Sequence, residues 1–345
     1  MSAVAAKLVP NDPRVKYATT TVRGKTYAYM LGEPEGGKTP RETIVLVHGF
    51  PDLGFGWRCQ VPYLVGLGFR VIVPDMLGYG GTDAPQEIAA YSLKSLSDDV
   101  ADLARQFVGQ DGQIILGGHD WGGALVWRVA MWHPDLIGAV FSVCTPYNAP
   151  RPQYISVEAM VASGQVPNFA YQLQLKGPDV EARIQGEEKL RQFLNGMYGG
   201  FGPNGETGFK ATEGVLFDNL PLLGKTALLS DAELDFYVQQ YARQAAPQLR
   251  GPLNWYRSRA ETFEEEKPLA ERGVRLEMPA LLVTASRDSA LPPSMSAGME
   301  KHFAKLSRGE VDASHWALTH AADEVNGLIG KWIESVLVGG LKPSL

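Results

Sequence analysis

The eleven residues from Gln113 to Gly123, QIILGGHDWGG, decide the fold of this chain. The apolar run at their start is typical of a strand that is buried on both faces of a sheet. The run ends in a Gly-x-Asp-x-Gly turn centred on Asp120, and a helix is expected to follow over residues 122–133, up to Pro134. Glycines on both sides of Asp120 predict a turn so sharp that larger side chains would collide with the strand and the helix.

Asp120 stands where α/β-hydrolases carry their nucleophile, on a strained turn between a strand and a helix. The usual nucleophile is a serine, but a carboxylate is already ionised at neutral pH and can attack an sp³ carbon directly. The product is an alkyl ester of the protein, whose carbonyl carbon water can then attack. The positive end of the following helix also favours the anion. The alternative is that Asp120 only caps that helix, and the strand and the paired glycines argue against it.

Strand and helix patterns alternate along the first half of the chain, which predicts a mostly parallel sheet with helices on both sides. A helix is indicated by apolar residues spaced three and four apart between Leu93 and Phe107. The strands are expected over residues 15–22, 25–31, 44–48, 70–75, 113–117 and 139–144.

The pattern changes between about Pro146 and Ala260, where helical stretches such as 187–198 and 231–244 alternate with Gly- and Pro-rich turns. Strands return over residues 280–285 and 309–312, and a last helix is expected over residues 323–338. We therefore predict an α/β-hydrolase core made of residues 1–146 and 266–345, interrupted by a helical cap (lid) domain of residues 147–265.

A second loop after a strand, His48-Gly-Phe-Pro-Asp52, predicts the oxyanion hole. In this fold one backbone N–H comes from that loop and another from the residue after the nucleophile, so the expected donors are Phe50 and Trp121. A cis bond before Pro51 would suit such a turn. His48 is interpreted as a structural histidine of this loop, with a catalytic base as the alternative. His119, next to Asp120, is expected to point away from the site.

The acid and the base of the triad follow the nucleophile in chain order in this fold. Asp288 comes just after the strand 280–285, at the end of the sheet where α/β proteins place their sites. His315 follows the strand 309–312 and is the candidate base for water, with Asp288 orienting its ring. The rival residues are the carboxylates Glu310 and Asp312 and the histidines His302 and His320.

Composition limits the classes of partner. The net charge is −6 without a basic stripe, so no nucleic acid is expected. Neither a secretory signal nor a membrane segment is recognisable, and we expect a soluble, cytoplasmic protein without membrane insertion. Cys59 and Cys144 are not expected to form a disulfide, and no metal or other cofactor is predicted, because the histidines lack metal-binding spacing. The sequence predicts no particular oligomeric state.

From about Arg23 to Leu337 the chain resembles the soluble epoxide hydrolases. The resemblance implies conversion of small apolar epoxides to vicinal diols, through an ester on Asp120 that is hydrolysed by water activated by His315. It implies no cofactor, and we expect no counterpart of the N-terminal phosphatase-like domain of the vertebrate members. The motifs that carry the resemblance are residues 48–52, 74–83, 117–123, 285–288 and 314–316.

Two further stretches, FAYQLQL at residues 169–175 and GPLNWYR at residues 251–257, resemble the tyrosine motifs of the family's lid. The resemblance implies that Tyr171 and Tyr256 donate hydrogen bonds to the epoxide oxygen. The chemistry needs such donors independently, because ring opening releases an alkoxide and a phenol stays protonated at pH 7. Departures from the family pattern at Gln174, Lys176 and residues 289–293 affect the expected substrate shape more than the mechanism.

Aromatic residues near these motifs are candidates for the walls of a substrate pocket, with plain core packing as the alternative. Trp57 and Trp316 are the predicted substrate-binding residues, and Trp121, Phe201 and Met160 are further candidates.

Three other functions compete with epoxide hydrolysis. A haloalkane dehalogenase also uses an Asp nucleophile, but its halide needs N–H donors and no proton, so the paired tyrosines argue against it. A carboxylester hydrolase is disfavoured because attack by Asp120 on an ester would form an anhydride. A catalytically inactive receptor for a small ligand would be expected to lack some of the five mechanistic residues.

Overall fold

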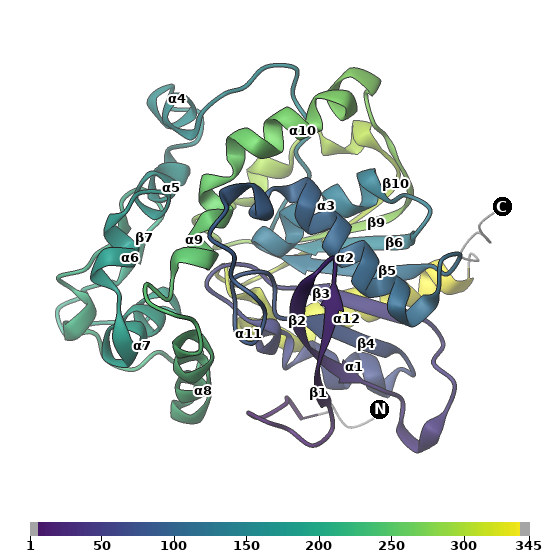
Figure 1. Ribbon diagram of the computed structural model, residues 1–345, viewed down its shortest axis with the longest axis horizontal. Coiled ribbons are helices and arrows are strands. Elements are labelled where there is room, and N and C mark those ends of the chain that lie inside the picture. The colour runs from purple at the N-terminus through teal and green to yellow at the C-terminus, as the bar shows by residue number, and fades with distance from the viewer. Residues whose placement is uncertain (1–5, 339–345) are drawn as a thin grey trace. The chain divides into compact units, whose positions relative to one another are not determined.

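Eight strands form one sheet within residues 6–338, the part of the chain that the computed structural model describes (Figure 1). The strand order is β1-β2-β4-β3-β5-β6-β9-β10. The pairs β1–β2 and β2–β4 are antiparallel, and the other neighbours are parallel. The bounds are β1 Lys16–Val22, β2 Lys25–Gly32, β3 Thr43–Val47, β4 Arg70–Pro74, β5 Ile114–His119, β6 Ile137–Val143, β9 Leu276–Ala285 and β10 Phe303–Val311.

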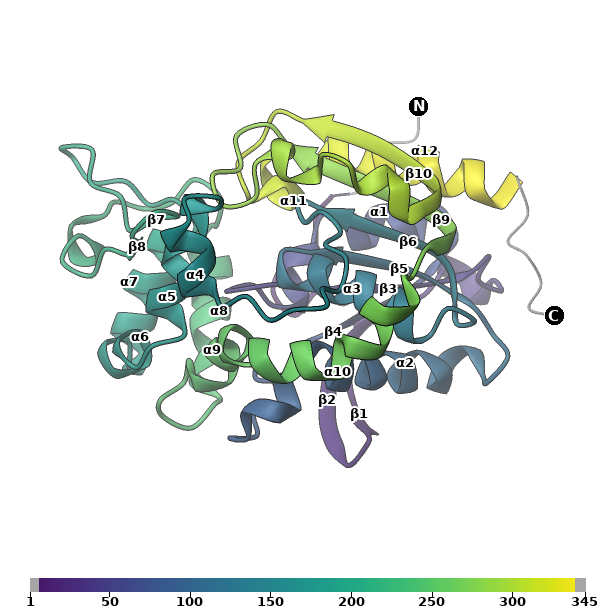
Figure 2. The same ribbon diagram turned by 90° about the horizontal axis from the view of Figure 1, so that it is seen from above.

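The central strands explain the apolar runs of the sequence. Every residue of β3, β5 and β6 is buried, because helices cover both faces of the sheet. Figure 2 shows α1 and α12 over one face and α2 and α3 over the other. These helices span α1 Gln60–Gly66, α2 Leu93–Val108, α3 Trp121–Trp132 and α12 Ala322–Val338, and a short helix, α11 Ala317–His320, precedes α12. The predicted mostly parallel sheet with helices on both sides is confirmed.

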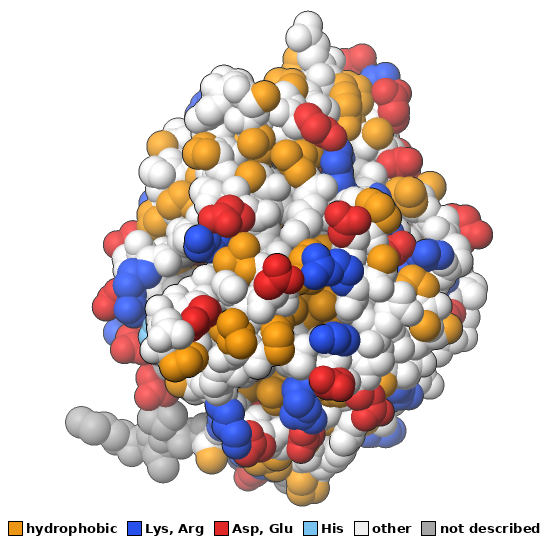
Figure 3. Space-filling view, turned by 90° about the vertical axis from the view of Figure 1, so that its left-hand side faces the viewer, with side chains coloured by type: hydrophobic (Ala, Val, Ile, Leu, Met, Phe, Trp, Pro, Cys, Tyr) orange, Lys and Arg blue, Asp and Glu red, His pale blue; other side chains and the backbone are white. Residues whose placement is uncertain are grey.

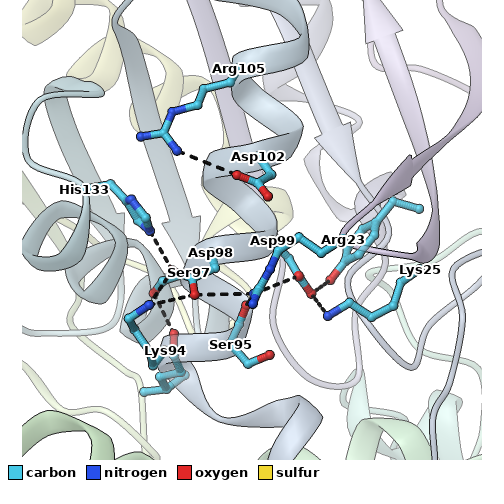
Figure 4. Close-up of polar contacts among 12 residues, drawn as sticks. Arg23, Lys25, Lys94, Ser95, Ser97, Asp98, Asp99, Asp102, Arg105 and His133 are labelled. Atoms are coloured by element: carbon cyan, nitrogen blue, oxygen red, sulfur yellow. Dashed lines mark hydrogen bonds and ion pairs between the residues drawn. The ribbon is translucent and has the colours of Figure 1, made fainter. Parts of the chain in front are cut away.

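A polar cluster on α2 fixes this helix to its neighbours (Figure 4). The Asp99 carboxylate has no exposed surface and accepts hydrogen bonds from the Tyr27 hydroxyl and the Lys25 ammonium group, both at 2.7 Å. Burial raises the pKa of Asp99 even though Lys25 and Tyr27 oppose the shift. Asp98, one residue earlier, lies 2.9 Å from Nε2 of His133 at the end of α3. The cluster therefore joins α2 to the β1–β2 hairpin on one side and to α3 on the other.

β10 differs from the prediction. It begins at Phe303, whereas the sequence indicated a strand only over residues 309–312. Its first six residues are mostly exposed because β10 is the edge strand of the sheet, paired only with β9. Only its two end residues, Phe303 and Val311, are buried, so the strand has no continuous apolar run and hydropathy indicated only its last part.

The chain divides into two compact units. Among the described residues, the first contains residues 6–76, Leu93–Pro152 and residues 265–338. The second contains Leu77–Ser92 and Gln153–Glu264, and helix α10 (Arg259–Arg272) crosses the last boundary. The predicted domain limits, after residues 146 and 265, stay a prediction; they leave Leu77–Ser92 with the core, whereas this segment clusters with the second unit.

The second unit is mainly helical. It contains α4 Val157–Ala162, α5 Ala170–Leu175, α6 Asp179–Arg183, α7 Gly186–Met197, α8 Asp231–Ala242 and α9 Arg250–Arg257, with a two-stranded hairpin of β7 (Phe209–Lys210) and β8 (Gly214–Val215). Figure 3 shows Lys and Arg side chains interspersed with Asp and Glu on the face of this unit that the view presents. The exposed ion pairs of this unit include Arg191–Asp235 and Lys225–Asp231. No helix within residues 6–338 is both long and apolar enough to cross a membrane.

Candidate active site

Asp120 occupies a sharp turn between β5 and α3 in the first unit. Its backbone has φ 54° and ψ −123°, a conformation that is strained for any residue other than glycine. A Cβ atom on Gly118 would stand 2.3 Å from the carbonyl oxygen of Gly122, and one on Gly122 would stand 2.1 Å from that of Val47. The turn can therefore form only with glycines at these two positions. These are the collisions with strand and helix that the sequence pattern predicted.

The loop after β3 contacts the Asp120 carboxylate. The Phe50 N–H donates to Asp120 Oδ1 at 2.7 Å, and the Phe50–Pro51 peptide bond is cis, as expected. A Cβ atom on Gly49 would stand 2.3 Å from Asp120 Oδ1 and 2.7 Å from the Trp121 nitrogen. Gly49 thus lets the loop approach the carboxylate and the first residue of α3 together.

Asp288 and His315 complete a triad with Asp120. His315, which follows β10, has its Nδ1 atom 2.7 Å from Oδ2 of Asp288 and its Nε2 atom 3.4 Å from Oδ2 of Asp120. Asp288 follows β9, and its Oδ1 atom accepts hydrogen bonds from the Ala290 and Leu291 N–H groups, both at 2.9 Å. Three residues that are far apart in sequence thus meet at the carboxyl ends of parallel strands.

The triad has the electrostatics of a buried cation held between two carboxylates. Burial would raise the pKa of Asp120, but the hydrogen bond and charge of His315 outweigh burial and lower it. Burial would also raise the pKa of Asp288, but the charge and hydrogen bond of His315 outweigh it and lower the pKa to about 2. For His315 burial would lower the pKa, but the charge of Asp288 and the hydrogen bond to Asp120 raise it well above its ordinary value.

Two buried side chains that the sequence did not assign to the site hold the backbone of His315. His119 Nε2 donates to the His315 carbonyl at 2.8 Å, and the Cys144 thiol donates to the same oxygen at 3.5 Å. The ring centroids of His119 and His315 lie 4.9 Å apart, so the expectation that His119 points away from the site is wrong. No local motif indicated this contact, because the two residues are 196 positions apart.

Nitrogen atoms of His119 and His315 and the sulfur of Cys144 lie within 4.8 Å of one another, a set that could in principle hold a metal ion. Burial raises the pKa of the Cys144 thiol well above its ordinary value, which disfavours the thiolate that a metal requires. Both nitrogens of His315 also face carboxylates. This set therefore suits a base and its supports better than a metal centre. Cys59 and Cys144 are both free thiols.

The other histidines and carboxylates that the sequence offered as alternatives make contacts outside the triad. His48 is fully buried, with Nδ1 2.9 Å from the Gly49 carbonyl and Nε2 accepting from the Met76 N–H at 2.9 Å, so it orders the loop as the structural interpretation expected. Asp312 pairs with Arg287, and Glu310 accepts from Thr284. His320 lies on α11, where it accepts from the Ser314 N–H at 3.3 Å, and the ring of His302 packs on Tyr147.

Tyr171 and Tyr256 lie in the second unit, on α5 and α9. Both are buried, and their ring centroids are 6.1 Å apart with the planes at 79°. Tyr171 also packs edge-on against Phe209 of the small hairpin at 5.3 Å, and Gln172 Nε2 donates to its hydroxyl at 3.4 Å. The structure thus brings the two predicted phenols together, and their action on a substrate at Asp120 stays a prediction.

The predicted pocket walls have varied environments, and their roles stay predictions. The Trp316 ring lies 5.5 Å from that of His315, next to the triad. Trp57 has no exposed surface and packs against Phe141 of β6, which is a core position. Phe201 is 61% exposed. Met160 is buried, and its sulfur accepts a hydrogen bond from Arg259 Nη2 at 3.4 Å.

Comparisons with known proteins agree with this architecture. The family described as the alpha/beta hydrolase fold matches residues 42–321. The chain is 43% identical to epoxide hydrolase srdG of Neurospora crassa, over 96% of this chain and 98% of that protein. It is 34% identical to mouse (Mus musculus) bifunctional epoxide hydrolase 2, over 94% of this chain, and it spans only 56% of that longer protein.

A solved structure gives the same result in three dimensions. The crystal structure of epoxide hydrolase A from Mycobacterium thermoresistibile superposes with a TM-score of 0.76 at 28% identity, covering 93% of this chain and 98% of that one. Residues 42–321, which the α/β-hydrolase family matches, include the strands from β3 to β10, the elbow at Asp120 and both other members of the triad. The chain therefore belongs to the epoxide hydrolase family of the α/β-hydrolase fold.

Proposed function

We propose that this protein converts small apolar epoxides to vicinal diols through a covalent ester on Asp120. The observation that carries the proposal is the pairing of Asp120 with an N–H donor on Oδ1 and with the His315 ring on Oδ2. A carboxylate on an elbow that usually holds serine suits attack on an sp³ carbon. The names of relatives in fungi, mammals and mycobacteria, all epoxide hydrolases, support the same substrate class.

In the first step a carboxylate oxygen of Asp120 attacks one carbon of the epoxide, and the bond from that carbon to the ring oxygen breaks. Tyr171 or Tyr256 donates its phenolic proton to the developing alkoxide while the other phenol hydrogen-bonds to it. Esterification removes the negative charge of Asp120, which is one cause of the raised pKa of His315. His315 can then release its proton, which restores the phenol, and the ring becomes a neutral base.

In the second step neutral His315 takes a proton from water, and the resulting hydroxide attacks the carbonyl carbon of the ester. The Phe50 and Trp121 N–H groups stabilise the tetrahedral oxyanion. Its collapse breaks the bond to the diol oxygen, which takes the proton of the newly formed carboxylic acid. Asp120 is again a carboxylate and His315 a cation, and Asp288 stabilises that cation throughout. One water is consumed, and its two hydrogens replace those that the phenol and the carboxylic acid of Asp120 have passed to the diol, so no external acid or base is needed.

A single-turnover reaction in ¹⁸O-labelled water, with protein in excess over a terminal epoxide such as styrene oxide, tests the proposal. The first diol should contain no label, because its new oxygen comes from Asp120, and the peptide that contains Asp120 should gain ¹⁸O. Label in the first diol would contradict the covalent route. Halide release from a haloalkane should be measured in parallel, since halide without any diol would identify a dehalogenase instead.

A further inference from the structure

Arg257 is the last residue of α9 and has no role in the proposed chemistry. Every nitrogen of its guanidinium group nevertheless donates a hydrogen bond within the second unit. Nε donates to the Lys176 carbonyl at 3.0 Å, and Nη2 donates to the Gly177 carbonyl at 2.9 Å. Nη1 donates to Glu181 Oε2 at 3.0 Å and to Asn254 Oδ1 at 3.1 Å. All three nitrogens therefore have partners, on three separate stretches of chain.

Two of these partners belong to the end of the helix that carries Tyr171. Lys176 and Gly177 directly follow α5 (Ala170–Leu175), and the last carbonyls of a helix lack partners within the helix. A cation at that end is also favourable for the helix dipole. α5 has only six residues, too few for a helix that holds itself in place. Arg257 therefore secures the end of α5 to the helix that carries Tyr256.

The geometry points to Arg257 as a positioning residue that sets the separation of the two phenols. This inference rests on the proposed function, in which both hydroxyls must reach one epoxide oxygen. Such hydrogen bonds need heavy-atom distances near ~2.7 Å, and a shift of about 1 Å can cost roughly 100-fold in rate. The Arg257 and Glu181 side chains are only 14% and 12% exposed, so water competes little for their hydrogen bonds. A lysine lacks the planar fork that reaches all of these acceptors.

Arg250 is a matched control on the same helix. It also binds Glu181, at 3.0 Å through Nη2 and at 3.4 Å through Nε. Its third hydrogen bond goes to Gln86 Oε1 at 3.2 Å rather than to the end of α5. Removing Arg250 therefore weakens the Glu181 ion pair and leaves the contacts with Lys176 and Gly177 in place.

The test compares wild type, Arg257→Gln, Arg257→Lys and Arg250→Gln in single turnovers that separate ester formation from ester hydrolysis. Both Arg257 variants should form the ester at least about tenfold more slowly and hydrolyse it at the wild-type rate. Arg250→Gln should keep both rates within about threefold. Equal losses in both steps, or equal losses in the Arg250 and Arg257 variants, would overturn the positioning role. Melting temperatures confirm that each variant is folded.

A double-mutant cycle covers the case in which Arg257→Gln is only poorly folded. In a Tyr171→Phe background, Arg257→Gln should slow ester formation much less than in wild type, because the phenol that it positions is already absent. An undiminished loss in that background would overturn the inference even if the variant is unstable. If Tyr171→Phe and Tyr256→Phe both keep the wild-type rate of ester formation, the proposed acid role itself fails. If they lose rate while Arg257→Gln does not, only the positioning role fails.

Discussion

The Nε2 atom of His315 lies 3.4 Å from Oδ2 of Asp120, so the residue proposed as the base of the second step is the direct neighbour of the proposed nucleophile. The anion of Asp120 and that of Asp288 both help to keep a proton on His315. Forming the ester removes the first of these charges and leaves the second. In the proposed mechanism, ester formation therefore lowers the pKa of His315 and lets the ring lose its proton before the step that needs a neutral base.

A variant that imitates this loss of charge should have a less basic His315. In Asp120→Asn the ring loses one of the two anions that raise its pKa, so its proton should dissociate at lower pH than in wild type. Titration of the His315 ring by NMR measures both values directly. An unchanged pKa would show that Asp120 does not control the charge of the base.

Replacing the base should separate the two steps. In His315→Gln the nucleophile is intact, so the protein should still form the ester, while its hydrolysis should slow by roughly 10³-fold or more. Intact-protein mass spectrometry should then show an adduct with the mass of the epoxide. Asp120→Ala serves as the control and should show neither adduct nor diol, and an adduct in that variant would place the nucleophile elsewhere.

The two phenols should substitute for each other in part. Tyr171→Phe and Tyr256→Phe should each slow ester formation by about tenfold, and the double variant should lose about 10²–10⁴-fold, the range of general acid catalysis. Rapid-quench measurement of ester formation gives these rates. Tyr154→Phe, which alters a tyrosine that is 46% exposed, should have no effect. A double variant no slower than the single ones would mean that only one phenol acts.

Gly49 should tolerate no side chain. A Cβ atom there would stand 2.3 Å from Asp120 Oδ1 and 2.4 Å from its Cβ, so Gly49→Ala must displace the nucleophile or the loop that carries the Phe50 N–H. We expect kcat to fall by about 100-fold. Gly327 in α12 has nothing within 4 Å of the added carbon, and Gly327→Ala should keep full activity and gain up to about 1 kcal/mol of stability. Equal activity of the two variants would refute the steric argument.

Stability in the first unit should depend on a buried ion pair between α3 and α10. Arg128 Nε lies 2.9 Å from Glu266 Oε1, with side chains 11% and 8% exposed. Glu266→Ala leaves an unpaired buried cation and should lower the free energy of unfolding by about 3–5 kcal/mol. The double variant Arg128→Met/Glu266→Leu should regain most of that loss in urea unfolding. Failure of the double variant to recover would indicate that the pair's geometry, rather than its charge, matters.

The sequence was sufficient for features that are local and for features that follow chain order. The elbow around Asp120 is a contiguous motif, and Asp288 follows the apolar end of β9. His315 follows a strand in the chain order expected of the base, so a single pass along the chain finds all three. The contact between His119 and His315 joins residues 196 positions apart, and no local sequence pattern near either residue predicts it. The first part of β10 was missed because most of its residues are exposed and this edge strand has no apolar run.

The triad lies wholly in the first unit and both phenols lie in the second, which has a practical meaning for engineering. In the proposed mechanism, directed evolution confined to residues 153–264 changes the groups that open the epoxide, and hence which epoxides are accepted, without touching the residues proposed to release the diol. Libraries of that kind should yield catalysts with shifted regiochemistry and intact deacylation.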